Sequence, residues 1–530
     1  ARMNALDYVV VTVYLGALLG LGFIWRSQPT ESDYFLGGRK LGWAPLSLSV
    51  MATQLSAVSF ISAPAFVGLR EGGGLKWLAY EISVPLSMIL VMFVIAPVIH
   101  RAGVVSIYEF LERRFGRTTR LLISISFQIV RAVSTGVMVY AMGIILEVAL
   151  SAPFWASIIG VGVITLVYSV SGGMKAVVYG DAIQMVLITA GLVFLAFCAL
   201  GEIGGFSAFW REVDPARFQV IDAKAFGLSG DEFGFIPMLF GGFILYASYY
   251  GCDQTQAQRI MSARDIGDAR RLLFANGVLR FPLVLLYCFT GLFIGVAVMN
   301  DPAMLNLIPP DKPDYMMPVY IAEKLPHGII GLLYVAILAA AMSSLSSAIN
   351  SLAAVSLEDL SAIGLIRREG RARAVLARWV TVFWGVLILI LSAFAGAIAP
   401  TVIEAINKVG SAMFGPILAV FLAGILSKRI RPGAVNLGLL AGVALNIYLW
   451  RAAPEIFWMW WNVTGFVAAI AVMCAAHLTF GANRAVVSPE DSSSAIRSIM
   501  ALYGGMLVAF FLVILAVCLW LGAAGGRIAS

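Results

Sequence analysis

Long apolar stretches recur along the whole chain and limit what it can fold into. About fourteen runs of roughly 18–28 mostly apolar residues follow one another, each long enough to cross a ~30 Å hydrocarbon core as a helix. They lie near residues 6–25, 44–69, 77–99, 121–150, 155–173, 179–201, 233–257, 272–298, 328–357, 375–398, 401–427, 432–450, 455–479 and 500–522. Backbone polar groups in lipid need partners within the segment, which favours helices. The sequence predicts an all-α polytopic membrane protein.

Composition supports this class and argues against several others. Hydrophobic residues make up 61% of the chain and charged residues 12%, whereas soluble proteins average about 25% charged residues. The net charge of +7 does not indicate a nucleic-acid partner, because basic residues of membrane proteins collect in cytoplasmic loops. The five cysteines lack metal-ligand spacing. The sequence shows neither a phosphate-binding glycine motif nor a His/Asp catalytic cluster, so we do not expect an enzyme.

The distribution of basic residues predicts the orientation. Loops after odd-numbered runs hold about 23 Lys and Arg, and those on the other side roughly 10, so the former should be cytoplasmic. Both termini are then extracytoplasmic, in a plasma membrane, with a bacterial inner membrane favoured. The first run is expected to be a true span. Residues 106–120 should form an amphipathic interfacial helix with its Arg side toward headgroups, and 484–498 a flexible cytoplasmic linker.

A stripe of hydroxyl groups interrupts the ninth apolar run. At helical spacing one face carries Ala340, Ser343, Ser344, Ser347 and Ser351. At membrane depth such a stripe must face protein, water or an ion. Packing of small residues between helices is the alternative to a cation site.

The second run is also too polar for a lipid-facing helix. It holds Thr53, Gln54, Ser56 and Ser59 within seven residues, followed by Pro64. We interpret it as a broken helix whose unwound carbonyls could bind Na⁺ and whose half-helix N-terminus could face an anionic substrate. Hydroxyls bonded back to their own helix are the alternative.

Two more polar segments lie at span ends. Asp181 follows the helix-breaking pair Gly172-Gly173 and lies a turn or more into the sixth run. A carboxylate there needs a cation, and with Ser346 and Ser347 it could form a second hard-cation site, unless it only caps a helix. The polar stretch 246–259 should line a water-filled path, or be an ordinary polar helix end.

Charged residues inside the runs need partners as well. An Arg at the depth of Arg131 costs at least ~2.5–3.5 kcal/mol on insertion scales, so we expect a carboxylate beside it. That carboxylate could be Glu81, as a structural pair, or a substrate held by two hydrogen bonds. Arg280 and Lys408 lie nearer to span ends and could extend to the interface.

Several motifs together resemble the sodium/solute symporter family. The matching stretches are residues 34–40, 106–115, 172–181, 253–259 and 340–347. The resemblance implies a LeuT-like five-plus-five inverted repeat with discontinuous first and sixth core helices. It divides the chain into a leading helix and loop (1–43), a first repeat (44–201), a loop (202–232), a second repeat (233–427) and trailing helices (428–530).

The resemblance also implies where ions bind. The family's main sodium site uses carbonyls of the first core helix with a carbonyl and hydroxyls of the eighth. The matching residues are Ala52, Leu55, Ala340, Ser343 and Ser344. Some members bind a second sodium ion near an Asp of the fifth core helix, a pattern matched by Asp181, Ser343, Ser346 and Ser347. We therefore expect one or two sodium ions.

For the substrate, the resemblance favours an anion. Ser56, Ser59 and Arg131 match positions that hold a carboxylate in sialic acid transporters, and Glu81 matches a hydroxyl-binding Glu of the bacterial sugar transporter. Asp253 and Thr255 depart from the sugar transporter's pattern. Further lining candidates are Thr53, Gln54, Asp253 and Asn407.

The sequence thus predicts sodium-coupled import of a small organic anion, such as a sialic acid, a sugar acid or a monocarboxylate, by alternating access. A neutral-hexose symporter and an uncoupled channel or uniporter are the alternatives. The expected partners are the bilayer and the anion, with no nucleic acid, and a monomer should suffice.

Overall fold

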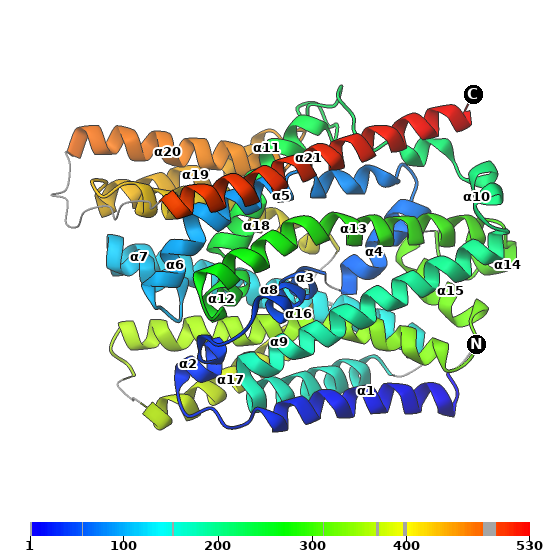
Figure 1. Ribbon diagram of the computed structural model, residues 1–530, viewed down its shortest axis with the longest axis horizontal. Helices are drawn as coiled ribbons and strands as arrows, with labels where there is room; N and C mark the ends of the chain where they lie inside the picture. Colours follow the sequence, from blue (N-terminus) through cyan, green and yellow to red (C-terminus); the bar gives the residue numbers. More distant parts are fainter. Residues whose placement is uncertain are drawn as a thin grey trace.

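Long helices form nearly all regular structure in the computed structural model, which describes residues 3–55, 57–150, 153–310, 312–366, 370–395, 400–480 and 494–529. The helices run roughly along the longest axis of an elongated bundle (Figure 1). The described residues contain no strand, only isolated bridges between Leu41 and Ala263 and between Asp222 and Gly234. The all-α prediction is therefore confirmed.

The helices up to the first long loop are α1 (Ala5–Ile24), α2 (Glu31–Leu36), η1 (Gly37–Arg39), α3 (Trp43–Gln54), α4 (Ala57–Gly68), η2 (Leu75–Glu81), α5 (Val84–Leu90), the π-helical turn η3 (Val91–Ile95), α6 (Ala96–Ala102), α7 (Ile107–Phe115), α8 (Arg117–Leu150) and α9 (Phe154–Ile203). The loop carries α10 (Phe206–Glu212) and η4 (Pro215–Phe218).

The helices that follow the loop are α11 (Phe235–Cys252), α12 (Gln254–Ser262), α13 (Ile266–Met299), α14 (Pro302–Leu305), η5 (Pro313–Tyr315), α15 (Met316–Lys324), α16 (Ile329–Ala362), α17 (Gly370–Ala395), α18 (Pro400–Leu426), α19 (Pro432–Ala452), α20 (Trp460–Phe480) and α21 (Ser494–Ala529). α16 is the most deeply buried long helix and packs against α9, α8, α1 and α17.

Among the described residues, eleven helical segments are long and apolar enough to cross a membrane. The other three of the fourteen expected spans correspond to the pair α3–α4, to the second part of α9 and to α18. The total number of spans stays a prediction.

Two core helices are broken where polar residues interrupt apolar runs. α3 ends at Gln54 and Leu55 leaves helical geometry (φ −78°, ψ 81°) before α4 begins. Asp253 (φ −92°, ψ 126°) separates α11 from α12 in the same way. These breaks confirm the predicted discontinuity of the first and sixth core helices.

Gly173 divides α9 into two helices. Its backbone has φ 54° and ψ −147°, and a Cβ there would lie 2.4 Å from Gln28 Oε1 and 2.6 Å from the Tyr34 carbonyl oxygen. Only glycine fits this conformation and this close approach. The break predicted at Gly172-Gly173 is therefore present.

Helix α7 corrects part of one expectation. Ser106 caps it, and its apolar side chains Ile107, Tyr108, Leu111 and Phe115 are buried. They pack on α8 and α18, so protein rather than lipid covers the apolar face. The linker expected at 484–498 falls largely outside the described residues.

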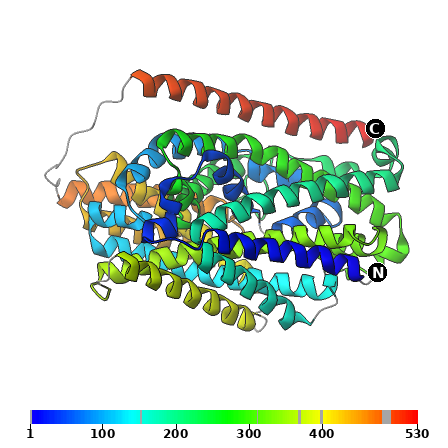
Figure 2. The same cartoon turned by 60° about the horizontal axis from the view of Figure 1, so that its bottom comes forward.

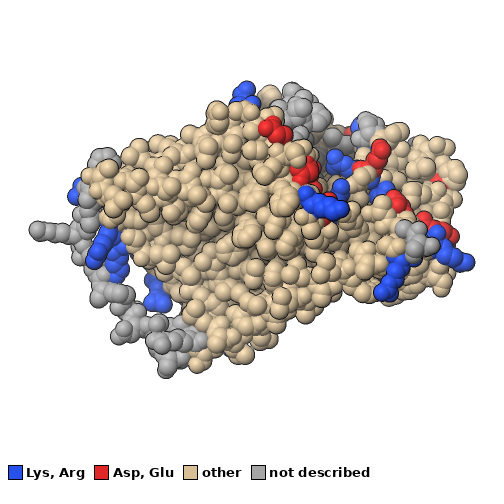
Figure 3. Space-filling view, turned by 90° about the horizontal axis from the view of Figure 1, so that it is seen from above, with Lys and Arg blue, Asp and Glu red and all other residues tan. Residues whose placement is uncertain are grey.

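The two ends of the bundle differ in charge. In Figure 3 a broad surface without charged residues separates Lys and Arg at one end from mixed acidic and basic residues at the other. Both chain termini lie at the mixed end (Figure 1). Figure 2 shows α21 along one flank of the bundle, where it packs on α5, α13 and η4.

Candidate functional site

The break after α3 faces the serine stripe of α16. Ser343 Oγ donates to the Ala52 carbonyl oxygen at 3.0 Å, and Ser344 Oγ to that of Thr53 at 3.4 Å. Both hydroxyls also reach the Ala340 carbonyl, at 3.1 and 3.4 Å. Leu55 is buried at the break itself. The structure thus brings Ala52, Ala340, Ser343 and Ser344 together beside Leu55.

This cluster suits a hard monovalent cation. Its groups are neutral carbonyl and hydroxyl oxygens, the ligand type that hard cations prefer. The described residues contain no group of three or more His, Cys, Asp or Glu that could hold a metal ion, so a transition-metal site is not favoured there. A buried site of neutral oxygens balances a singly charged ion better than a divalent one.

Asp181 lies in a separate buried cluster, one turn further along α16. Its Oδ2 accepts hydrogen bonds from Ser49 Oγ at 2.6 Å and from Ser347 Oγ at 3.3 Å. Arg259 Nη2 lies 3.2 Å from the same oxygen. The predicted partner Ser347 is therefore present, whereas Ser346 donates to the Ser343 carbonyl of its own helix.

Thr53 belongs to this second cluster. Its hydroxyl lies 2.9 Å from Ser347 Oγ and 3.5 Å from Asp181 Oδ2. Sequence reasoning did not identify Arg259 as the partner of Asp181, although an arginine within the polar stretch 253–259 was a signal that a buried carboxylate had a cation close by.

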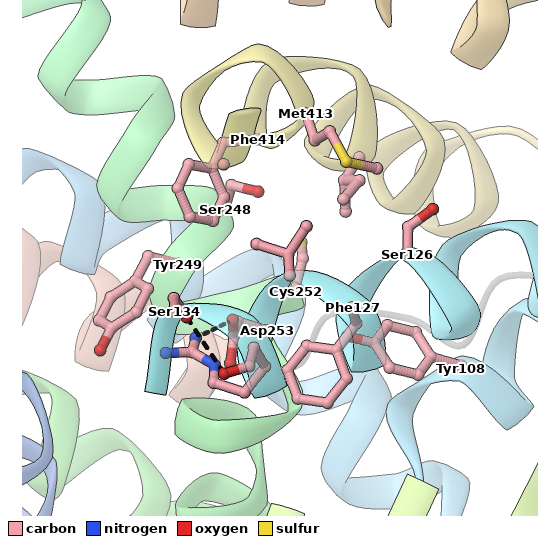
Figure 4. A pocket seen from close by; sticks show the side chains of 14 residues that line it. Tyr108, Ser126, Phe127, Ser134, Ser248, Tyr249, Cys252, Asp253, Met413 and Phe414 are labelled. Carbon is pink, nitrogen blue, oxygen red and sulfur yellow. Dashed lines mark hydrogen bonds and ion pairs between the residues drawn. The ribbon is translucent and has the colours of Figure 1, made fainter. Parts of the chain in front are cut away.

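A cavity of about 180 Å³ lies between α8, the α11–α12 break and α18 (Figure 4). Its polar lining includes Arg131, Asp253 and the hydroxyls of Ser126, Ser134 and Ser248. Its apolar and aromatic lining consists of Tyr108, Phe127, Val130, Tyr249, Cys252, Met413, Phe414 and Ile417.

Arg131 and Asp253 form an ion pair at the edge of this cavity. The Arg131 side chain is 22% exposed and that of Asp253 is 8% exposed. The other carboxylate oxygen of Asp253 accepts from the Thr255 backbone N–H at 2.8 Å and so caps α12. The pair therefore ties α8 to the break in the sixth core helix.

Of the two alternatives for the partner of Arg131, a pair with Glu81 or a substrate carboxylate, the pair with Glu81 is wrong. Glu81 forms two hydrogen bonds with Arg280, at 3.0 and 3.1 Å, and both side chains are almost fully buried. Arg280 consequently does not extend to the interface as expected. Arg131, Glu81 and Arg280 lie on α8, η2 and α13, and Asp253 lies at the α11–α12 break, so the packing of these elements selects each partner.

The half-helix α12 departs from the expected water-filled path. All its residues are buried, and its glutamines bond to protein: Gln254 to the Val105 carbonyl and the Ile107 N–H, Gln258 to Phe35 and Asn350. Within the stretch 246–259, the end of α11 and Asp253 line the cavity, and α12 does not.

Other residues that were predicted to bind substrate either do not line this cavity or lie outside the described residues. Gln54 and Glu81 do not line the described cavity. Ser56, and the side chains of Ser59, Asn407 and Lys408, lie outside the described residues. Substrate contact by these residues stays a prediction. The aromatic walls, Phe127, Tyr249 and Phe414, were missed because apolar positions inside spans carry no distinguishing signal.

Comparison with known proteins agrees with this geometry. Residues 34–442 match the model of the sodium:solute symporter family. The human sodium/iodide cotransporter is 29% identical over 84% of this chain and 70% of its own length. Human sodium-coupled monocarboxylate transporter 1 is 28% identical over 84% of this chain and 73% of its own.

Among solved structures, a Na⁺-coupled sialic acid symporter in a substrate-bound outward-open state superposes with a TM-score of 0.82. It is 22% identical, and the match covers 91% of this chain and all of that one. This likeness supports the LeuT-like fold. The chain, a multi-pass membrane transporter that couples a small-molecule substrate to sodium, is a member of the sodium:solute symporter family.

Proposed function

We propose that this symporter imports a small organic anion, and that Arg131 binds its carboxylate. The observation that carries the proposal is an arginine that lines a cavity inside the bundle and has one carboxylate as its ion-pair partner among the described residues. A guanidinium is suited to bind a carboxylate through two parallel hydrogen bonds. The relatives' names, iodide and monocarboxylate transporters, support an anion.

Asp253 would be exchanged for the substrate. In the structure it takes up the charge of Arg131, and a substrate carboxylate competes for the same guanidinium. Asp253 keeps its bond to the Thr255 N–H when Arg131 turns away. Binding would therefore loosen the link between α8 and the α11–α12 break, which gives substrate a direct effect on a helix junction.

The cavity wall favours a carboxylate with a compact apolar body over a heavily hydroxylated one. Beyond the ion pair, the lining residues carry three serine and two tyrosine hydroxyls, and the other lining side chains are apolar or aromatic. A buried polyol needs a partner for each hydroxyl group. Within the predicted group of anions, we therefore place monocarboxylates ahead of sialic and sugar acids, and neutral hexoses last.

Sodium would bind at Ala52, Leu55, Ala340, Ser343 and Ser344. The oxygens come from the broken first core helix and from α16, so a bound ion fixes one relative to the other. We further propose that the basic end of the bundle is cytoplasmic, because Lys and Arg collect there, which makes both termini extracytoplasmic in a plasma membrane. One chain carries both sites, which supports a functional monomer.

Uptake into proteoliposomes tests the proposal. With an inward sodium gradient, we expect accumulation of pyruvate or benzoate to exceed that of N-acetylneuraminate, and glucose to remain at background. Arg131→Gln should lose uptake, and Arg131→Lys should retain part of it because the charge remains. Equal uptake of a carboxylate and its neutral amide would overturn the role of Arg131. Substrate flux that ignores the sodium gradient would support an uncoupled channel instead.

A further inference from the structure

A buried arginine, Arg259, lies beside the residues that are predicted to bind sodium ions. Arg259 of α12 and Asp181 of α9 are both completely buried, with Nη2 and Oδ2 3.2 Å apart. Arg259 Nε donates to Ser49 Oγ at 3.1 Å, and Nη2 also donates to Ser347 Oγ. The guanidinium thus lies among the oxygens that Asp181, Ser49 and Ser347 supply.

We propose that Arg259 permanently occupies the cation position at Asp181, so that the protein binds a single sodium ion, at the break between α3 and α4. The inference rests on the sodium site proposed above, and it decides between the one and two ions that the sequence left open.

The charge of Asp181 is already balanced within the protein. Asp181 is the carboxylate within ion-pair distance of Arg259 among the described residues, so the buried pair is neutral. A sodium ion added there would lie directly beside the guanidinium of Arg259. Two like charges at such a distance in a buried site repel each other strongly, a repulsion that the first ion site, built of neutral oxygens, does not have. The arginine therefore opposes a second ion electrostatically as well as sterically.

The Arg259 guanidinium also makes the helix contacts that an ion at this point would make. The guanidinium contacts α3 through Ser49, α9 through Asp181 and α16 through Ser347, and its Nη1 donates to the Thr255 carbonyl at 2.5 Å. A sodium ion at this point would join the same three helices. Because the guanidinium belongs to a side chain of α12, its positive charge moves with α12 and is never released.

The same oxygens would suit sodium once the guanidinium is removed. Asp181 Oδ1 has no hydrogen-bond partner among the residues described, and Ser49, Thr53 and Ser347 direct hydroxyls at Oδ2. A carboxylate with surrounding hydroxyls is an all-oxygen set of the kind that hard cations prefer. Arg259→Gln should therefore convert the cluster into a second sodium site.

Sodium binding to the purified protein without substrate tests this directly. Equilibrium binding of radioactive sodium should give one ion per wild-type chain, two for Arg259→Gln, and one again for the neutral double variant Asp181→Asn/Arg259→Gln. Two ions per wild-type chain, with one lost in Asp181→Asn, would overturn the proposal. So would a folded Arg259→Gln protein that binds only one. If that variant does not fold, the wild-type count still decides.

Transport gives a second readout, which separates this inference from the proposed substrate. One sodium ion carried with one monocarboxylate moves no net charge, so uptake should be insensitive to membrane potential. A neutral substrate would make the wild type electrogenic while its sodium count stayed at one, which would contradict the proposed function alone. A count of two with an anionic substrate would contradict this inference alone.

Discussion

Arg131 and Arg280 both lie within apolar runs of the chain, but they differ in what surrounds them. Arg280 uses two nitrogens on both oxygens of Glu81, and neither side chain is appreciably exposed. Arg131 makes contact with one oxygen of Asp253 and faces a cavity. A buried pair in which both carboxylate oxygens are bonded is out of reach of a substrate, whereas a partly exposed one-bond pair beside a cavity is accessible. Arg280 is therefore suited to hold helices together and Arg131 to exchange partners.

This contrast predicts opposite phenotypes for the two carboxylates. Glu81→Gln should lower the stability of the detergent-solubilised protein by about 3–5 kcal/mol, because it leaves Arg280 charged and unpaired. Asp253→Asn should lower it less, since Arg131 reaches the cavity and its water. Thermal unfolding measures both. Glu81→Gln/Arg280→Gln should recover part of the loss. A Glu81→Gln protein that unfolds like wild type but fails to bind substrate would instead make Glu81 a ligand.

At this scale the sequence predicted the need for ion pairs but not their partners. The energetic cost of an unpaired charge in lipid required a carboxylate near Arg131 and a cation near Asp181. The choice of Asp253 over Glu81 depends on the relative depth and rotation of α8, η2 and the α11–α12 break. Apolar periodicity determines the depth and rotation of a helix only to within several residues. An error of that size is enough to replace one candidate partner of Arg131 by another.

At the scale of elements, breaks were more predictable than burial. The polar residues after Met51 correctly indicated an interrupted helix, because an unwound backbone in a membrane protein requires nearby polar or protein partners. The interruption at Asp253 was predicted from the family resemblance, whereas the polar residues there were interpreted as a water-filled path or a polar helix end. The same polarity led to a wrong environment for α12, whose side chains bond to α2, α7 and α16 rather than to water. A polar side chain inside the bundle must have hydrogen-bond partners, but the packing of the helices decides whether those partners are protein groups or water.

The break in α9 leads to a prediction of its own. Gly173→Ala should destabilise the protein by roughly 1–3 kcal/mol, because alanine is strained at this φ and ψ and its Cβ would overlap Gln28 and Tyr34. Gly160→Ala, in the same helix, places its new Cβ where no other atom lies within 4 Å, so it should be neutral or slightly stabilising. Thermal unfolding compares the two. Equal melting temperatures would show that α9 relaxes around the substitution.

For the whole molecule, coupling depends on which helices each site joins. The proposed sodium site connects α3 to α16, and the proposed carboxylate site connects α8 to the α11–α12 break. Helices α3 and α12 are themselves in contact, as are α8 and α16. An ion that fixes α3 against α16 can thus bias the position of Asp253 relative to Arg131 without direct contact between the two ligands. Motion of these packed units gives the sites a shared equilibrium.

Such coupling must be reciprocal, which makes it measurable. If sodium raises substrate affinity by some factor, substrate must raise sodium affinity by the same factor, commonly 5–150-fold in coupled systems. We expect Ser343→Ala to weaken sodium activation about tenfold, as the loss of one good polar contact of ~1.4 kcal/mol would, and to remove most of the sodium effect on substrate binding at low sodium. Ser392→Ala is the matched control, since among the described residues that buried hydroxyl donates to the Leu389 carbonyl of its own helix and to no other group. Substrate titrations at several sodium concentrations measure both factors. Unequal factors at equilibrium would mean that a further ion takes part, and unchanged sodium dependence in Ser343→Ala would place the sodium site elsewhere.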